Sequence, residues 1–290
     1  MPRAEAAQGV EQRMGEPFSA FTFVDRITQL EPGKRAQGRF TVPERLGDFR
    51  SSLIAEAVGQ LAAWVSMAHL DFRLRPVAGL AGRARFLGDV RPGELLELEV
   101  ELESCDDDAV AYGGVARVNG APVLELARCL GPMLPLADFD APDAVRGRFE
   151  VLCGRGAPVG RFPGVADPAT EIVEHGPGKL RATLRVPRDA AFFGDHFPRR
   201  AVFPGTLLLD AQIRLALELA RATAGAGEQL VPASVSNVKI RSFILPGQEV
   251  ELRAELASEA DEPMTVALAA RVDGKPVSTA RMAIAAREAA

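Results

Sequence analysis

The strongest constraint on the fold of this chain is an internal repeat. The stretch FLGDVRPGELLELEVELES resembles SFILPGQEVELRAELAS, and ARVNGAPVLELA resembles ARVDGKPVSTA. Three pairs of residues share one separation of 154 positions: Pro92 and Pro246, Arg117 and Arg271, and Glu56 and Asp210. A constant offset over three landmarks is hard to obtain by chance, so the sequence predicts two copies of one fold.

Each copy shows the same order of elements. An apolar run of helical length comes first, SSLIAEAVGQLAAWVSMAHL or GTLLLDAQIRLALELARAT, and strands with nearly alternating polarity follow, such as ELLELEVELES and EVELRAELAS. Asn119-Gly120 and Asp273-Gly274 are typical of two-residue hairpins. A long helix followed by an antiparallel meander indicates an α+β unit, in which a sheet wraps a buried helix. Trp64, within the first helix, is interpreted as a core residue.

The copies differ ahead of their helices. Val42-Pro43 matches Val186-Pro187 at an offset of only 144, so the first copy lacks ten residues at this point. The missing residues correspond to part of the stretch AAFFGDHFPRRAVFPGTLLLDAQ, which includes His196. Between the copies, residues 138–168 form a connector rich in Pro, Gly and Asp, which leaves room for a short strand at GRFEVL.

Composition favours a cytoplasmic globular protein. A net charge of −5 and a pI near 5.5 argue against nucleic acid or an anionic membrane as partner. The three cysteines show no metal-type spacing, which suits a reducing compartment. No apolar run is long enough to span a bilayer, and residues 1–17 are expected to be a disordered N-terminus rather than a signal peptide.

The residues around His196 resemble those of the hot-dog-fold β-hydroxyacyl-thioester dehydratases of fatty-acid and polyketide synthesis. That family's pattern places His-Phe before Val-x-Pro-Gly-x-Leu, with an acid fourteen residues after the histidine. Here the pattern is carried by His196, Phe197, Val202, Pro204, Gly205, Leu207 and Asp210. FFGDH and the Asp resemble the dehydratase–isomerase branch, whereas EAVGQ in the first copy resembles the branch that uses Glu. Ala201 stands where the family usually has proline.

The resemblance implies a double hot-dog fold packed as an intrachain pseudo-dimer with one continuous antiparallel sheet. The first hot-dog is expected at residues 18–137, the connector at 138–168 and the second hot-dog at 169–290. In this family a histidine from one hot-dog meets an acid on the central helix of its neighbour. His196 is therefore expected to pair with Glu56, while Asp210 faces no histidine and is left open between a remnant and a structural group.

The chemistry suits these residues. A neutral imidazole is a suitable base near pH 7, and an acid in apolar surroundings such as LIAEAVGQLAAW holds a proton more readily. Gln60, one turn after Glu56, is expected to hold the acid or a water. The N–H of Gly205, at a helix start, is expected to stabilise the enolate oxygen. Phe193 and Phe197 are expected to bind substrate.

The predicted function is thus a 3-hydroxyacyl-thioester dehydratase acting on acyl carrier protein or CoA thioesters, without a metal or redox cofactor and with a homodimer left open. Two alternatives remain. A hot-dog thioesterase would use a carboxylate to direct water, and a non-catalytic partner would bind acyl chains or scaffold a synthase. Arg199 and Arg200 are interpreted as a solvated pair, with contact to an acidic carrier as the alternative.

Overall fold

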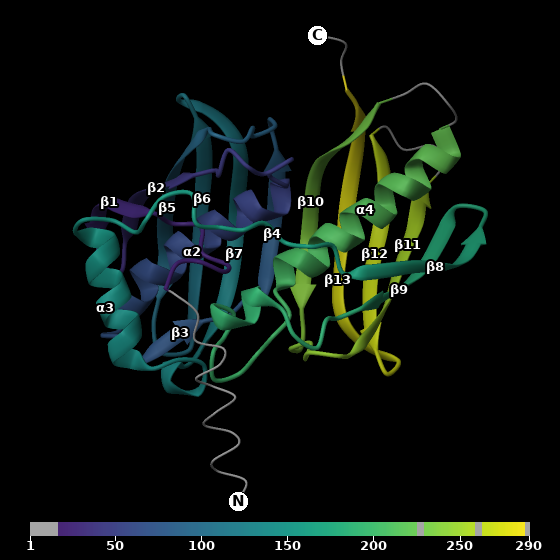
Figure 1. The fold of residues 1–290 in the computed structure, drawn as a ribbon. Coiled ribbons are helices and arrows are strands. Elements are labelled where there is room, and N and C mark those ends of the chain that lie inside the picture. Colours follow the sequence, from purple (N-terminus) through teal and green to yellow (C-terminus); the bar gives the residue numbers. More distant parts are fainter. Residues whose placement is uncertain (1–16, 225–228, 259–262, 288–290) are drawn as a thin grey trace, which may run out of the picture.

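The computed structural model describes residues 17–224, 229–258 and 263–287. Residues 1–16, most of the predicted disordered N-terminus, lie outside the described residues. Within the described ranges the strands form a continuous antiparallel sheet, and long helices lie across it (Figure 1). No helix in these ranges combines the length and apolarity needed to cross a membrane.

The elements follow the predicted order. The first part of the chain forms β1 (Arg26–Glu31), β2 (Arg35–Thr41), α2 (Ser51–His69), β3 (Leu74–Pro76), β4 (Leu80–Phe86), β5 (Leu95–Cys105), β6 (Ala109–Val118) and β7 (Ala121–Pro135). After α3 (Pro142–Cys153), the second part forms β8 (Ala169–Gly176), β9 (Lys179–Arg185), α4 (Gly205–Ala224), β10 (Leu230–Ile240), β11 (Glu249–Ser258), β12 (Met264–Val272) and β13 (Lys275–Ala286).

The strand order repeats on either side of one seam. Strands β4 and β10 pair at the centre of the sheet, where Ala84 lies opposite Val235. Outward from this seam the order is β7, β6, β5, β2, β1 on one side and β13, β12, β11, β9, β8 on the other. The two halves of the sheet are therefore built from corresponding strands, as the sequence repeat predicts.

The long helices are held by their apolar faces. In α2 the side chains of Ile54, Ala57, Val58 and Leu61 are fully buried, at the three- and four-residue spacing of a helix packed on a core. This helix packs against β5 and β2, while α4 packs against β11 and β10, and the two helices also contact each other. Alternate residues of β5, such as Leu96 and Leu98, are buried on the side of the sheet that faces α2.

The turn chemistry confirms the predicted hairpins. Asn119 and Gly120 have φ values of 50° and 78° between β6 and β7, and Asp273 and Gly274 have 50° and 75° between β12 and β13. Two consecutive positive φ values match the right-handed twist of the paired strands, which is why Asn-Gly and Asp-Gly are favoured there.

The connector differs from the prediction of a short strand at GRFEVL, because these residues belong to helix α3. Pro142 begins this helix, where its missing N–H costs nothing. Val145 and Leu152 are buried at helical spacing, and the Phe149 ring packs on Trp64 with centroids 6.1 Å apart. Helix α3 lies at the outer edge of the sheet beside β1 (Figure 1), and it helps to bury Trp64 as a core residue.

The ten-residue difference between the copies lies in one loop. Residues 186–204 connect β9 to α4, whereas residues 42–50 connect β2 to α2. The longer loop contains His196, and the shorter one has no counterpart to it.

Candidate active site

The loop that carries His196 is anchored through the preceding residue. The carboxylate of Asp195 accepts hydrogen bonds from the backbone N–H groups of Ala20 and Phe21, at 3.1 and 2.8 Å, and from the Thr22 hydroxyl at 3.0 Å. The Phe21 ring then packs edge-on against the His196 ring, with centroids 5.8 Å apart. The chain's first described segment therefore fixes the position of the histidine.

The hydrogen bonds of His196 define its protonation. Its Nδ1 lies 3.1 Å from the carbonyl oxygen of Val202. Because a carbonyl only accepts, Nδ1 carries the hydrogen and Nε2 is unprotonated in the neutral ring. Burial lowers the pKa of His196 below its ordinary value of 6.5, and the charge of Arg75 acts in the same direction against the opposing effect of Glu56. The ring is thus a neutral base at pH 7 with Nε2 available.

Glu56 is held at both of its oxygens. Gln60, one helical turn later, donates from Nε2 to Oε1 over 2.9 Å. Thr206, at the start of α4, bonds through its hydroxyl to Oε2 over 2.7 Å. The acid on α2 is therefore fixed partly by a residue from the other half of the sheet.

Gln60 is itself locked by the backbone. Its Nε2 also donates to the carbonyl of Phe21 over 2.9 Å, and its Oε1 accepts from the N–H of Phe23 over 2.9 Å. These bonds fix which end of the amide faces Glu56, so Oε1 of Glu56 must accept. When Glu56 is protonated, the proton consequently resides on Oε2, beside the Thr206 hydroxyl.

His196 and Glu56 line one cavity of about 270 Å³. Both side chains are half-buried, and the charge of Glu56 influences the pKa of His196, so the two groups lie within electrostatic reach. Apart from these groups the walls are largely apolar, as in most small-molecule sites. The lining comes from α2 (Glu56, Gly59, Gln60, Ala63), α4 (Gly205, Thr206, Leu208) and strands of both halves (Ala84, Leu126, Val238).

Gly205 begins α4 on the wall of this cavity. Among the described residues, no hydrogen-bond partner is found for the N–H of Gly205 or of Thr206. Such free donors at a helix start favour a negatively charged oxygen. A Cβ at position 205 would lie 2.5 Å from Cδ1 of Ile240, so a side chain here would crowd the cavity wall.

The two predicted substrate-binding phenylalanines lie in different places. Phe197 lines the cavity, and its ring stacks on that of His196 with centroids 4.2 Å apart. Phe193 is buried against Phe192, with ring centroids 4.5 Å apart, and is not among the residues that line the cavity. Phe193 therefore supports the loop from the core.

The polar groups of the cavity that sequence reasoning missed include Thr206 on α4, Arg75 on β3 and Tyr112 on β6. Burial lowers the pKa of Arg75 to about 10, and burial raises the pKa of the Tyr112 hydroxyl well above its ordinary value. Cys129 beside them has its pKa raised to about 11 by burial, so it is a poor nucleophile at pH 7. Neither Arg75 nor Tyr112 belongs to a motif, and only the folding of β3 and β6 brings them to the cavity.

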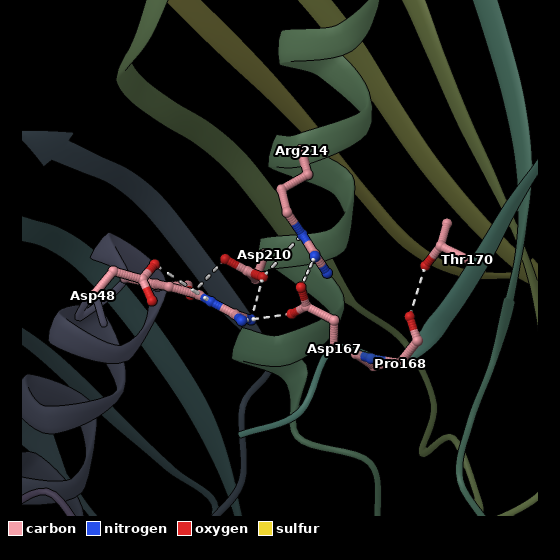
Figure 2. Close-up of polar contacts among 8 residues, drawn as sticks. Asp48, Asp167, Pro168, Thr170, Asp210 and Arg214 are labelled. Carbon is pink, nitrogen blue, oxygen red and sulfur yellow. Dashed lines mark hydrogen bonds and ion pairs between the residues drawn. The ribbon is translucent and has the colours of Figure 1, made fainter. Parts of the chain in front are cut away.

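The position equivalent to Glu56 holds a different arrangement. Asp210 on α4 is buried and forms ion pairs with Arg50 at 2.9 Å and with Arg214 at 3.2 Å, and the Ser52 hydroxyl donates to it over 3.3 Å. Asp167 joins the same two arginines at 2.5 and 2.6 Å. Figure 2 shows Asp210, Arg214 and Asp167 gathered in this network. The structure thus brings Asp210 to arginines and not to a histidine.

Comparisons with known proteins identify dehydratases that are similar to part of this chain. The profile of the ApeI-like family, described as ApeI dehydratase, matches residues 173–281. The 3-hydroxyacyl-[acyl-carrier-protein] dehydratase FabZ of Colwellia psychrerythraea is 35% identical over 121 residues, which are 40% of this chain and 81% of that protein. FabZ of Bacillus subtilis is 36% identical over 118 residues, which are 37% of this chain and 83% of that protein.

Solved structures with a similar fold include thioesterases. Acyl-CoA thioesterase II TesB2 from Mycobacterium marinum has a TM-score of 0.55 at 12% identity and covers 96% of this chain and 98% of its own. An acyl-ACP thioesterase from Bacteroides thetaiotaomicron has a TM-score of 0.54 at 10% identity, and the match covers 87% of this chain and 98% of that chain. At such identities the likeness shows the fold alone.

Fold and site together define a hot-dog protein in which a histidine and a carboxylate line one cavity. The extent of the match to FabZ proteins shows that the chain belongs to the 3-hydroxyacyl-[acyl-carrier-protein] dehydratase family.

Proposed function

We propose that this chain is a 3-hydroxyacyl-thioester dehydratase of double hot-dog architecture, with residues 18–137 and 169–290 as its two hot-dogs. The observation that carries the proposal is that His196 of the second half and Glu56 of the first half line one cavity. The repeated strand order on both sides of the β4–β10 seam supports the double arrangement. The presence of His196 and Glu56 in one cavity supports an active site shared between the two halves.

His196 is the base in the proposed reaction. Its Nε2 removes a proton from the α-carbon of the 3-hydroxyacyl thioester, and the electron pair moves onto the thioester carbonyl oxygen as an enolate. The N–H groups of Gly205 and Thr206 stabilise this oxygen at the start of α4. A lowered pKa keeps the imidazole neutral before the step, so it is ready to accept the proton.

Glu56 is the acid. Its Oε2 proton passes to the 3-hydroxyl group, which leaves as water while the enolate electrons form the new double bond. Gln60 keeps Oε1 as an acceptor and thereby directs the proton to Oε2. The base gains one proton and the acid loses one, so a proton transfer from His196 to Glu56 restores the enzyme.

The carrier is proposed from the relatives. The FabZ proteins that the chain resembles are 3-hydroxyacyl-[acyl-carrier-protein] dehydratases by name, so we propose acyl carrier protein as the partner that delivers the substrate. CoA thioesters present the same reacting atoms and serve as convenient substrates for a test.

The test is reversible hydration of a 2-enoyl thioester, followed through the loss of its conjugated absorbance. The wild-type protein is expected to hydrate the enoyl thioester, and His196→Ala to be slower by about 10²- to 10⁴-fold, the usual contribution of a general base. His175→Ala is the matched control, because His175 is exposed on β8. A thiol reagent in the same assay detects hydrolysis.

The outcomes separate the alternatives. Release of free thiol without hydration would favour a thioesterase, to which the fold of the solved neighbours also corresponds. Neither reaction, with acyl chains still bound, would favour a non-catalytic partner. Either outcome would overturn the proposed dehydratase.

A further inference from the structure

Arg75 is a cation in the cavity that has no anionic partner within residues 17–224, 229–258 and 263–287. It lies on β3 and lines the cavity with His196 and Glu56. Its Nε is buried without a hydrogen-bond partner, and no hydrogen bond or ion pair joins its guanidinium to any residue of the described ranges. A guanidinium has five N–H donors and remains protonated at pH 7, so leaving it unpaired in a cavity is costly.

The nearby carboxylates do not satisfy it. Asp140 is buried, but its Oδ2 pairs with Arg148 and its Oδ1 accepts from the N–H of Ala141 over 2.7 Å. Glu56 already has Gln60 at one oxygen and Thr206 at the other. Both acids influence the pKa of Arg75 through space, yet each is hydrogen-bonded to other groups.

Stacking fixes where the guanidinium points. Its central carbon lies 3.7 Å from the centroid of the Phe197 ring, and the His196 ring is stacked on the same ring at 4.2 Å with planes 21° apart. Two planar groups cannot share one face of a ring at these distances. The Phe197 ring therefore separates Arg75 from His196, so Arg75 lines the cavity on the other side of that ring from the proposed base.

We propose that Arg75 forms an anion-binding subsite for the acyl group, so that the preferred substrate carries a carboxylate beyond its reacting carbons. This inference rests on the proposed function. The phosphate of a carrier arm bears similar charge, but it lies at the far end of the pantetheine chain from the thioester, whereas Arg75 is one aromatic ring away from His196. The subsite thus recognises the acyl end of the substrate.

The test compares matched thioesters. Wild-type protein is expected to dehydrate 3-hydroxyadipyl-CoA, or its longer homologues, with a kcat/KM about 10- to 100-fold above that for the 3-hydroxyalkanoyl-CoA of equal length, as for a hydrogen-bonded ion pair. In Arg75→Met the ratio should fall to near one. Arg83→Met is the matched control, because Arg83 is exposed on the neighbouring strand β4, and it should keep the wild-type ratio.

A binding measurement makes the subsite testable without turnover. Octanoate and octanol are titrated calorimetrically into wild-type protein, Arg75→Met and His196→Ala. We expect octanoate to bind more tightly than octanol in wild-type and His196→Ala proteins, and the difference to be lost in Arg75→Met.

The two measurements distinguish the failures. If the wild-type protein dehydrates 3-hydroxyalkanoyl thioesters and shows no preference for the substrate with a carboxylate, that result would overturn the subsite and leave the dehydratase intact, whether or not Arg75→Met folds. An equal loss of kcat on both substrates in Arg75→Met would also overturn it, because Arg75 would then act on the reacting atoms. If the protein does not dehydrate either thioester but binds octanoate selectively through Arg75, the proposed dehydratase is refuted and the anion-binding subsite is retained.

Discussion

Glu56 and Asp210 occupy equivalent positions of two equivalent helices, 154 residues apart, yet their surroundings have opposite character. Each carboxylate accepts a hydrogen bond from a hydroxyl at the start of the opposite helix: Thr206 donates to Glu56, and Ser52 donates to Asp210. Thr206 and Ser52 are themselves 154 residues apart, so the contact obeys the pseudo-symmetry of the fold.

The difference arises one helical turn later. Gln60 is a neutral donor to Glu56, whereas its equivalent, Arg214, is a cation paired with Asp210. Arg50 adds a second positive charge to the Asp210 side. Burial raises the pKa of Asp210 and the two arginines oppose that rise. The hydrogen bonds to Glu56 thus come from the neutral side chains of Gln60 and Thr206, whereas Asp210 is held by two arginines.

The two loops ahead of the helices bring different side chains to these positions. Residues 186–204 bring His196 to the cavity that Glu56 lines. Residues 42–50 contain no histidine and bring Arg50 to Asp210. Arg50, at the end of the short loop, pairs with Asp210 and Asp167 across the two halves. The Asp210 side therefore carries a network of ion pairs between the two halves of the sheet.

The largest expected effect distinguishes Glu56 from Asp210 by the rate of the reaction. Glu56→Gln should lower the rate of dehydration by about 10²- to 10⁴-fold, because it removes the acid, whereas Asp210→Asn should change the rate by less than about threefold. Both rates are measured on the same 3-hydroxyacyl thioester at saturating concentration, through the appearance of the conjugated enoyl product. An essential Asp210 with a dispensable Glu56 would place the active site within the second half alone.

A smaller effect tests the shared hydroxyl contact. Thr206→Val keeps the shape of the side chain but removes the hydrogen bond to Oε2 of Glu56. Hydrogen bonds to charged groups contribute about 1.5–3 kcal/mol, so we expect a loss of roughly tenfold or more in kcat. Ser52→Ala removes the equivalent bond to Asp210 and should leave kcat unchanged. Equal effects of the two variants would show that the hydroxyls act only through packing between the helices.

Much of this contrast is readable in the sequence. The constant offset predicts the paired helices and the repeated strands, and the turn residues Asn119 and Asp273 predict the hairpins, because these signals are local and periodic. The family pattern predicts that His196 serves with Glu56, and the shorter first loop predicts that Asp210 lacks a histidine.

The remaining features depend on contacts distant in sequence. Asp195 binds the backbone of Ala20 and Phe21, more than 170 positions away, and Arg75 reaches the cavity only after β3 pairs with β7. The sequence does not predict helix α3, because the polarity of GRFEVL alternates weakly, as in a strand. Phe149 of this helix packs on Trp64 and Phe72, which lie elsewhere in the chain. No local pattern encodes such tertiary contacts.

The smallest expected effect concerns the titration of His196 and follows from the charges around it. Burial and Arg75 lower the pKa of His196, and Glu56 raises it. In the wild-type protein, NMR titration of the His196 ring should therefore give a pKa below 6.5, and the rate should rise with pH through that value as the base loses its proton. Glu56→Gln removes the charge that favours the imidazolium, so the pKa should fall further. Asp210→Asn, whose carboxylate is held by Arg50 and Arg214 outside the cavity lining, should leave the titration unchanged. A shift in Asp210→Asn with none in Glu56→Gln would mean that the imidazole senses the second position rather than the first.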